Sequence, residues 1–384
     1  MNNVDKQYFD MLRHIIKNGN EKMDRTLTGT TSVFSYDMRF DMNEGFPLLT
    51  SKKMAWKSMV VELIWFLRGD TNIKYLVDNG CMIWVGDAYK HYKNGVMFSS
   101  NPYDRNILSC KPAEGIEGMG SFEIGDDFTR EEFIEKIKTD DEFAKKWGEL
   151  GPVYGAQWRN WGGYKTSHQE QFASGGSFGG PTHITYGKIT EYDVPGVDQI
   201  ANLIKDLKTN PDSRRLMVNA WNVGELDKMT LPPCHYGFQC YTRELTSGER
   251  YRLYEMKLGV LFSYAPPEYK LDEENIPKRA LSLKWHQRSC DCGLGIPFNI
   301  ASYGLLLNLL AKEVNMIPEE LIFSGGDCHI YLNHIEPIKQ QLKQKTYKLP
   351  TIEIADKSIF DMDFNDIKLI GYESSPSIPM PLSN

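Results

Sequence analysis

One cysteine stands where a nucleophilic thiol would be displayed. The sequence reads Leu-Pro-Pro-Cys-His over residues 231–235, with Cys234 at its fourth position, and an alternating run follows to Tyr241. The two prolines restrict the backbone and supply no amide hydrogens, and the alternation is typical of a strand. The pattern predicts a thiol at the start of a β-strand. A buried structural cysteine is the competing interpretation, since free cysteines commonly behave as small hydrophobic side chains.

Arginines that could bind an anion occur at three places in the chain. These residues are Arg25, the pair Arg214 and Arg215, and Arg288, which is followed by Ser289. Arginines beside hydroxyl groups suit a phosphate, which accepts bidentate charge-assisted hydrogen bonds. A solvated surface role is the alternative for each arginine taken alone. The formal net charge of −7 argues against a role in coating nucleic acid, which needs a broad basic face. We therefore expect a local arginine cluster to hold any anionic ligand.

Four other polar residues lie in apolar or strand-like segments. Glu62 interrupts the apolar helical pattern of residues 55–67, either at the helix edge or as a carboxyl group with a shifted pKa. Asn299 stands near the start of an apolar helix, as an N-cap or as a partner for a ring that offers one donor and one acceptor, as uracil does. His329 and Tyr331 lie on the same side of a strand, where they could share a sugar hydroxyl or simply pack.

Periodicity elsewhere predicts the elements that must position these residues. We expect helices over residues 7–17, 55–67 and 301–314, and a strand over 32–40. Interspersed strands and helices favour an α+β fold with a mixed sheet.

Two segments are interpreted as insertions into this framework. Residues 97–150 combine a run rich in Gly, Ser, Pro and Asn with a charged helix, which begins at the capping box Thr129-x-x-Glu132. An irregular segment over 244–280 is the second insertion, and a further glycine-rich stretch covers 162–181.

Composition excludes other classes of protein. The polar amino terminus lacks the apolar core of a secretory signal, and no apolar run approaches the ~20 residues of a membrane helix. The seven cysteines form no CxxC unit, and the spacing of Cys290 and Cys292 matches neither a zinc knuckle nor a thioredoxin motif. We therefore expect a cytoplasmic protein with reduced thiols, no metal and no membrane partner.

Motifs spread over the chain resemble those of the thymidylate synthase family. They are residues 24–26, 62–67, 151–155, 212–215, 233–235, 287–291, 295–303 and 326–334. Motifs of this length in this order are highly specific, and the resemblance runs from about residue 7 to the C-terminus, apart from the insertions. It implies one catalytic domain over residues 1–384, with the family's α+β fold and a mixed β-sheet at a dimer interface.

The resemblance also implies a reaction for the candidate residues. Cys234 would add to C6 of 2′-deoxyuridine 5′-monophosphate (dUMP), and the resulting C5 carbanion would attack the one-carbon unit of 5,10-methylenetetrahydrofolate. Glu62 would organise waters and move protons at O4, and Tyr154 would help to remove the C5 proton. Arg288 near Cys234 would favour the thiolate.

Phosphate binding is implied for the arginines. Arg25, Arg215, Arg288 and Ser289 would hold the phosphate, with Arg214 also near it. In this family the Arg214–Arg215 pair reaches into the neighbouring subunit, so the resemblance implies an obligate homodimer.

The resemblance implies base, sugar and folate contacts as well. Asn299 favours uracil, because relatives that act on cytosine nucleotides carry an acid there, while His329 and Tyr331 favour a deoxyribose. The implied folate contacts are Trp84, Asp291 and Gly295.

Several departures from the family pattern lie on the folate side. Ala55 stands where many members carry a histidine, Asp87 where a second tryptophan packs, and Leu27 where the Arg25 loop has a glycine. The chain ends in Ser383-Asn384, whereas the family ends in a small apolar tail. An apolar lid keeps water from reactive intermediates. We therefore hypothesise that Asp87 and the polar tail admit and orient a water, which would quench the exocyclic methylene at C5.

The expected product is then 5-hydroxymethyl-dUMP, with tetrahydrofolate released. This reaction is that of the deoxyuridylate hydroxymethylases, which some bacteriophages use to make modified DNA, and would place the protein in a host cytoplasm. The alternative is an ordinary thymidylate synthase that gives dTMP and dihydrofolate. An alternative of another class is a non-catalytic nucleotide-binding or RNA-binding regulator. Cys234, Glu62 and Tyr154 disfavour it, because a binding protein needs no thiol.

Overall fold

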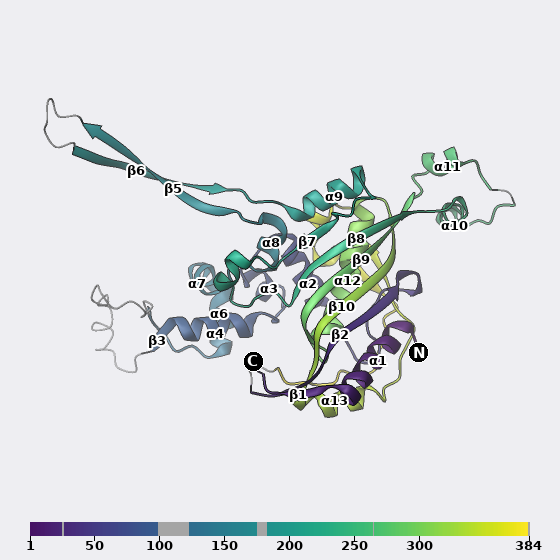
Figure 1. Cartoon of the computed structure of the whole chain (residues 1–384), viewed down its shortest axis with the longest axis horizontal. Helices are drawn as coiled ribbons and strands as arrows, with labels where there is room; N and C mark the ends of the chain where they lie inside the picture. The colour runs from purple at the N-terminus through teal and green to yellow at the C-terminus, as the bar shows by residue number, and fades with distance from the viewer. Residues whose placement is uncertain (25–26, 99–122, 175–182, 264, 383–384) are drawn as a thin grey trace.

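A six-stranded sheet forms the centre of the computed structural model, which describes residues 1–24, 27–98, 123–174, 183–263 and 265–382 (Figure 1). In spatial order its strands are β1 (Asn20–Lys22), β2 (Thr30–Asp41), β10 (Ile317–Tyr331), β9 (Arg279–Asp291), β8 (His235–Glu244) and β7 (Met217–Asn219). Strands β9 and β10 run parallel, and the other neighbours in this sheet run antiparallel. The predicted α+β fold with a mixed sheet is confirmed.

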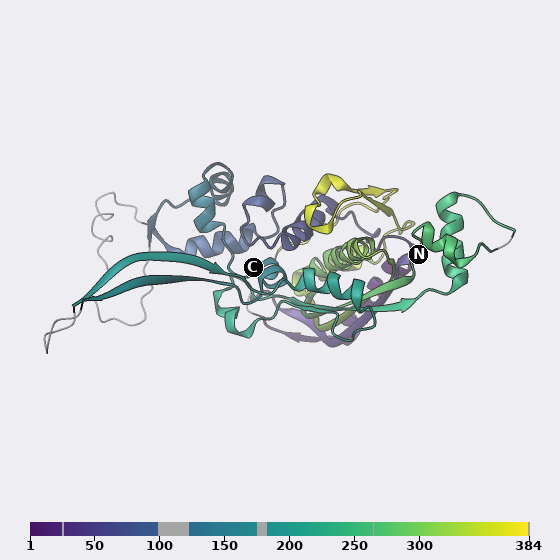
Figure 2. The ribbon, with the colours of Figure 1, turned by 90° about the horizontal axis from the view of Figure 1, so that it is seen from above.

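Helices cover one face of this sheet. Helix α1 (Asn3–Asn18) packs on β2, α12 (Gly295–Glu313) packs on β9 and β10, and α2 (Trp56–Leu67) packs on α12. In Figure 2, α12 lies between the sheet and the C-terminal segments that contain β11 (Thr351–Ile354) and β12 (Ile367–Ile370). Because α12 is enclosed in this way, it is apolar on most sides.

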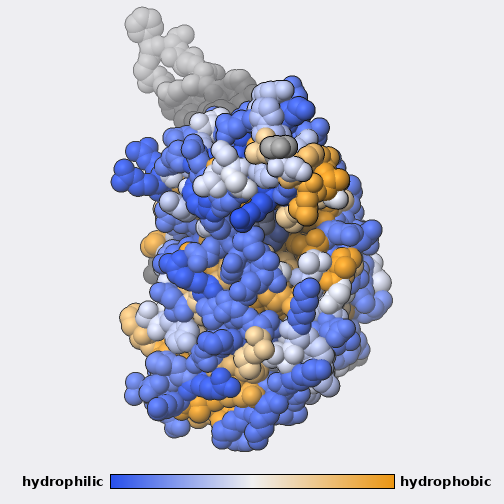
Figure 3. Space-filling view, turned by 90° about the vertical axis from the view of Figure 1, so that its right-hand side faces the viewer, coloured by the Kyte–Doolittle hydropathy of each residue, from blue (hydrophilic) through white to orange (hydrophobic). Residues whose placement is uncertain are grey.

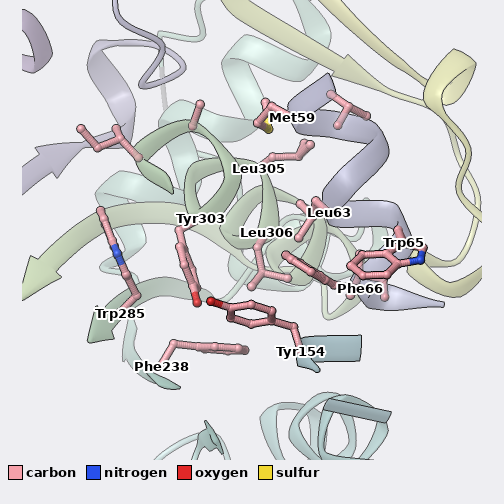
Figure 4. Packing of buried hydrophobic residues seen from close by; sticks show 14 of the residues in the cluster. Met59, Leu63, Trp65, Phe66, Tyr154, Phe238, Trp285, Tyr303, Leu305 and Leu306 are labelled. Carbon is pink, nitrogen blue, oxygen red and sulfur yellow. The ribbon is translucent and has the colours of Figure 1, made fainter. Parts of the chain in front are cut away.

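Five further helices lie between the elements already named in the order of the chain. They are α3 (Lys74–Asp78), α4 (Val85–Gly95), α8 (Tyr154–Asn160), α9 (Gln199–Thr209) and α13 (Ile335–Gln341). Large side chains fill the space between α2, α8, α12 and the sheet, as Figure 4 shows. The hydroxyl groups of Tyr154 and Tyr303 point toward one another there.

The predicted helices and strand are present with shifted ends. Helix α1 begins four residues earlier than expected, because the Asn2 side chain accepts a hydrogen bond from the Asp5 amide (2.8 Å) and caps it. Helix α12 begins six residues before the predicted start at residue 301. Local periodicity located these elements but did not fix their first residues, which for α1 depend on the cap at Asn2.

The first predicted insertion contributes helices to the main core. Helices α6 (Arg130–Thr139) and α7 (Asp141–Trp147) follow the short parallel pair β3 (Val96–Phe98) and β4 (Glu123–Gly125). The capping box of Thr129 and Glu132 is confirmed. Phe133 and Ile137 are fully buried in the core of the chain. Residues 99–122, most of the glycine-rich part, lie outside the described residues.

The prediction that residues 244–280 are irregular is wrong. They form α10 (Ser247–Leu258), which a second capping box begins, and α11 (Glu268–Glu273), and the two project from the ends of β8 and β9 (Figure 1). These helices bury few side chains, so their sequences show little apolar periodicity. Figure 3 faces this end of the molecule and shows apolar patches on a mostly hydrophilic surface, and Met256 and Leu261 are exposed here.

The glycine-rich stretch at 162–181 begins a long antiparallel hairpin. Strands β5 (Tyr164–Ser174) and β6 (His183–Val194) pair and extend away from the body of the molecule (Figure 1). Among the described helices, none is long and apolar enough to cross a membrane.

Candidate active site

Cys234 lies immediately before β8, as the alternating pattern predicted, and is half-buried. Its amide donates to the Tyr154 hydroxyl (2.7 Å), and its carbonyl accepts from the Arg288 amide (2.9 Å). The register of β8 against β9 shifts between His235 and Gly237. The cysteine backbone is therefore held from two directions, next to an irregularity in the sheet.

Tyr154 is the first residue of α8 and is buried. The turn before it requires a glycine, because Gly151 has φ +78° and a Cβ there would lie 2.0 Å from the Lys228 carbonyl oxygen. Burial, and secondarily the charge of Cys234, raise the pKa of Tyr154 well above its usual value. The phenol therefore keeps its proton at neutral pH, while its oxygen accepts the Cys234 amide.

His235 has a structural role that the sequence did not indicate. Its ring stacks on Tyr154 with centroids 4.2 Å apart, and its Nδ1 lies 2.8 Å from the Tyr303 hydroxyl. Burial lowers the pKa of His235 to about 3, so the ring is neutral at physiological pH. It orients the two tyrosines and cannot supply a positive charge to the thiolate.

Glu62 lies on α2. Its carboxyl group is buried, although the residue as a whole is slightly exposed to solvent. Burial raises the pKa of its carboxyl to about 7, opposed by a hydrogen bond from Trp84 Nε1 to Glu62 Oε1 (2.8 Å). A carboxyl with this pKa can give or take a proton near neutrality. The Trp84 ring also meets the Tyr154 ring edge-on at 5.9 Å. The structure thus brings Glu62, Trp84, Tyr154 and Cys234 together.

A second cluster forms an open pocket of about 450 Å³. Its lining residues are Lys22, Asp24, Thr30, Arg288, Ser289, Asp327, His329 and Tyr331. Four of these, Arg288, Ser289, His329 and Tyr331, were predicted from the sequence to bind the nucleotide. They meet because β9 and β10 are parallel neighbours, with Ser289 paired to Asp327 and Asp291 to His329.

Arg288 joins this pocket to the cysteine segment. Its Nε donates to the Pro233 carbonyl (2.9 Å) and its Nη2 to the Pro232 carbonyl (3.1 Å). The guanidinium also lies 5.0 Å from the ring centroid of Trp221. The two prolines therefore offer their carbonyls to the arginine, and Trp221 is a support that the sequence analysis missed.

His329 and Tyr331 lie at the carboxyl end of β10, with rings 5.3 Å apart in an edge-to-face contact. His329 Nδ1 is 3.4 Å from Asp327 Oδ1, and Lys22 Nζ is 2.5 Å from Asp327 Oδ2. Burial, the largest single influence, lowers the pKa of His329, but hydrogen bonds with Asp327 and the charges of Asp291 and Asp327 together outweigh it, so the pKa is raised overall. The same hydrogen bond, together with Lys22, lowers the pKa of Asp327 to about 2.

The other predicted arginines do not join this pocket in the described part of the single chain. Arg25 lies outside the described residues. Arg214 and Arg215 are exposed on the loop before β7, where Arg214 lines a separate small pocket. Leu27, beside Arg25, has φ +60°. This left-handed conformation favours glycine.

Asn299 lies in the second turn of α12, so the N-cap interpretation is wrong. Leu294 occupies the N-cap position without a side-chain cap hydrogen bond, and Asp291 Oδ1 accepts from the amides of Gly293 (2.9 Å) and Leu294 (3.2 Å) in the turn before the helix. A Cβ on Gly295 would lie 3.8 Å from Asn299 Oδ1 and 3.5 Å from Asp291 Cβ. Asp291, Gly295 and Asn299 therefore share one end of α12.

Buried cationic and aromatic groups on this side escaped the sequence analysis. Lys52 is buried, and its Nζ donates to the Gly293 carbonyl (2.6 Å). Burial lowers the pKa of Lys52 to about 8, opposed by Asp291. His334 is fully buried, with Nε2 2.7 Å from the Pro381 carbonyl oxygen. No sequence signal distinguishes these side chains from surface ones, because their partners lie far away in the chain.

Two of the predicted departures from the family pattern, Asp87 and the C-terminal tail, lie in different parts of the structure. Asp87 lies half-buried in the first turn of α4, three residues after Trp84. In the tail, Met380 packs against the core, and its Sδ lies 3.2 Å from the position of a Cβ on Gly293. Ser383 and Asn384 lie outside the described residues. Within the described chain, no group of three or more His, Cys, Asp or Glu side chains could hold a metal ion.

Comparisons with known proteins extend over almost the whole chain. A family model described as thymidylate synthase matches residues 6–384. A thymidylate synthase of Mycoplasma genitalium is 40% identical over 374 residues, which cover 97% of this chain and 98% of that protein. One from Mesoplasma florum is 38% identical over 374 residues, with 97% and 98% covered. One from Listeria monocytogenes serotype 4b is 38% identical over 380 residues, with 98% and 99% covered.

Proposed function

Because the chain belongs to the thymidylate synthase family, and is a one-carbon transferase that acts on dUMP, we propose that it makes thymidylate. In this reaction 5,10-methylenetetrahydrofolate supplies both the one-carbon unit and a hydride, giving dTMP and dihydrofolate. The observation that carries this choice of product is the packing of Met380, in the C-terminal tail, against the core. Met380 packs against the Gly293 turn beside Asp291, where it can help to exclude water.

The residues around Cys234 suit the covalent steps of this reaction. The Cys234 thiolate adds to C6, and the negative charge that develops passes toward O4 of the uracil. Glu62, with a pKa near neutrality, can exchange a proton at O4, directly or through water. C5 then attacks the methylene carbon and forms the new C–C bond.

Elimination and reduction complete the sequence. The C5 proton leaves with the help of Tyr154, and tetrahydrofolate departs from the bridging carbon to leave an exocyclic methylene. A hydride from C6 of tetrahydrofolate converts this methylene to a methyl group, and Cys234 is expelled as C6 recovers its double bond. Tyr154 is suited to proton relay because it stays protonated and contacts the Cys234 backbone.

The proposed roles in binding the nucleotide fall to residues of the open pocket and of the amino end of α12. Arg288 and Ser289 would hold the phosphate together with Arg25, while His329 and Tyr331 would contact the deoxyribose. Asn299 would pair with the uracil edge. The placement of Arg288, Ser289, His329 and Tyr331 around the pocket, and of Asn299 near the end of α12, supports the assignments of these five residues. On the folate side the proposed contacts are Trp84, which donates to Glu62, and Asp291 and Gly295, which lie beside one another at the start of α12.

We also infer a homodimer, the assembly typical of this family. Phe34, Met217 and Tyr241 are 88%, 54% and 68% exposed on the sheet, although apolar side chains favour burial. A second copy that covers this sheet would bury them. It would also let Arg214 and Arg215, exposed in the single chain, reach the phosphate pocket of the neighbouring subunit.

Hydroxymethylation of dUMP is the second candidate, and Asp87 favours it. A carboxylate beside Trp84 could orient a water toward the exocyclic methylene, and the chain ends in two polar residues. Water in place of hydride would give 5-hydroxymethyl-dUMP and release tetrahydrofolate, the bacteriophage-type reaction used for modified DNA.

A product assay separates the two candidates. The protein is incubated with dUMP and 5,10-methylenetetrahydrofolate, the nucleotide is identified by mass, and dihydrofolate is followed by absorbance. We expect dTMP and dihydrofolate in equal amounts. A hydroxymethyl nucleotide without dihydrofolate would refute thymidylate formation and support hydroxymethylation.

A trapping experiment addresses the non-catalytic alternative. With 5-fluoro-dUMP and the folate, the wild-type chain should form a covalent adduct, and Cys234→Ala should form none. No adduct in either protein would favour a nucleotide-binding regulator.

A further inference from the structure

One buried imidazole connects the folate side of the site to the C-terminal tail. His334 follows β10 and is 0% exposed. Its Nε2 lies 2.7 Å from the carbonyl oxygen of Pro381. A carbonyl oxygen can only accept a hydrogen bond, so the ring must carry a proton on Nε2 and donate it to the tail.

The other nitrogen of this ring faces the turn before α12. His334 Nδ1 lies 4.0 Å from Asp291 Oδ1 and has no hydrogen-bond partner among the described residues. It is also 2.7 Å from the position that a Cβ on Gly293 would occupy. A buried nitrogen without a partner is unfavourable, so packing alone gives little reason for a histidine rather than an apolar side chain here.

The tail has few other ways to be held. Upstream, the Ser375 amide donates to the Thr50 carbonyl (2.9 Å), and Ile378 is buried. Pro379 and Pro381 have no amide hydrogen to donate, and Leu382 is 65% exposed. The prolines reduce the amide hydrogens that this segment can donate, and His334 binds it through the carbonyl of Pro381.

We propose that His334 is a positioning residue that holds the C-terminal tail over the folate side of the site. By holding the tail, it favours hydride transfer over the addition of water to the exocyclic methylene. Gly293 is part of the same arrangement, because its lack of a side chain lets the imidazole and Met380 approach the turn. The effect on product rests on the proposed function, whereas the effect on the tail does not.

Two substitutions separate the hydrogen bond from the volume of the ring. His334→Gln keeps a side-chain N–H donor, and His334→Leu removes the donor and keeps an apolar group of similar size. Tyr89→Phe is the matched control, since it deletes a hydroxyl that donates to the Phe128 carbonyl (2.8 Å) far from the tail. Circular dichroism and gel filtration of the full-length variants would establish that each is folded.

The first readout is the attachment of the tail. Carboxypeptidase is added to the full-length protein, and release of Asn, Ser and Leu from the C-terminus is timed. We expect His334→Leu to release them about five- to tenfold faster than the wild type, the change for loss of one hydrogen bond. His334→Gln should fall between the two, and Tyr89→Phe should match the wild type. Equal release from His334→Leu and wild type would overturn the proposal.

The second readout is the ratio of the two nucleotide products formed from the exocyclic methylene, together with the KM for the folate. His334→Leu should raise the ratio of 5-hydroxymethyl-dUMP to dTMP and the KM for the folate, and His334→Gln should partly restore both. An unchanged ratio with faster tail release would refute the effect on product. If the wild type forms no dTMP at all, thymidylate formation fails, while the carboxypeptidase result still decides whether His334 holds the tail.

Discussion

The substitution Glu62→Gln tests the buried carboxyl that the mechanism needs. Burial raises the pKa of Glu62 from 4.5 to about 7. The unfolded chain therefore ionises at lower pH than the folded protein, and stability falls as pH rises through this interval. A shift of ~2.5 pKa units corresponds to at most about 3.4 kcal/mol. Glutamine keeps an oxygen to accept from Trp84 Nε1 but carries no charge, so it removes this cost.

The sign of the effect depends on pH. Below pH 4.5 the carboxyl is protonated in both states, and the variant should match the wild type. Stability lost by the wild type between pH 4.5 and 7 should be retained by Glu62→Gln, which should be the more stable protein at pH 8, by up to ~3 kcal/mol. Its activity should fall at least about 100-fold, since proton transfer commonly contributes 10²–10⁴.

Urea unfolding at pH 4.5 and pH 8, at one protein concentration because the protein is inferred to be a dimer, measures the difference. Glu135→Gln, at an exposed position on α6, is the control and should change little at either pH. If Glu62→Gln gained no stability between pH 4.5 and pH 8 relative to wild type, Glu62 would not be a buried carboxyl with a raised pKa. In that case its proposed role as the acid or base at O4 would lose its physical basis.

Further predictions concern backbone geometry and the tyrosine. Tyr154→Phe leaves the Cys234 amide without its 2.7 Å acceptor and removes the phenol, so kcat should fall about 100-fold while dUMP binding by calorimetry persists. Leu27→Gly relieves a left-handed conformation at φ +60° and should raise the free energy of unfolding by up to ~1 kcal/mol in urea titrations. Gly293→Ala places a methyl group 2.7 Å from His334 Nδ1. It should raise the KM for the folate and speed carboxypeptidase release of the tail, and unchanged values for both would contradict the close packing described here.

Local sequence patterns were enough to place the elements that carry the chemistry. Apolar residues at three- and four-residue spacing identified α2, and an alternating run identified β8. Because Glu62 belongs to the first pattern and Cys234 precedes the second, the elements that carry them could be predicted too. Such inferences succeed because helix and strand periodicity depends on neighbours in the chain.

Ends of elements were less predictable, and so were regions with little buried surface. The turn before α12 is held by Asp291, whose carboxylate accepts two of its amides, whereas the N-cap interpretation of Asn299, one of two that the sequence left open, placed the start of the helix too late. Helix α10 was missed because it buries too few apolar side chains to show a period.

The sequence by itself determined the family, the mixed α and β elements and the set of chemically able residues. Only the tertiary structure decided which of these residues meet. Tyr154 contacts Cys234 across 80 positions of sequence, and His334 contacts Pro381 across 47. It also decided that His235 is neutral and that Glu62 titrates near 7, because these pKa values depend on burial by distant segments. Contacts and burial of this kind arise when the chain packs, and no local pattern encodes them.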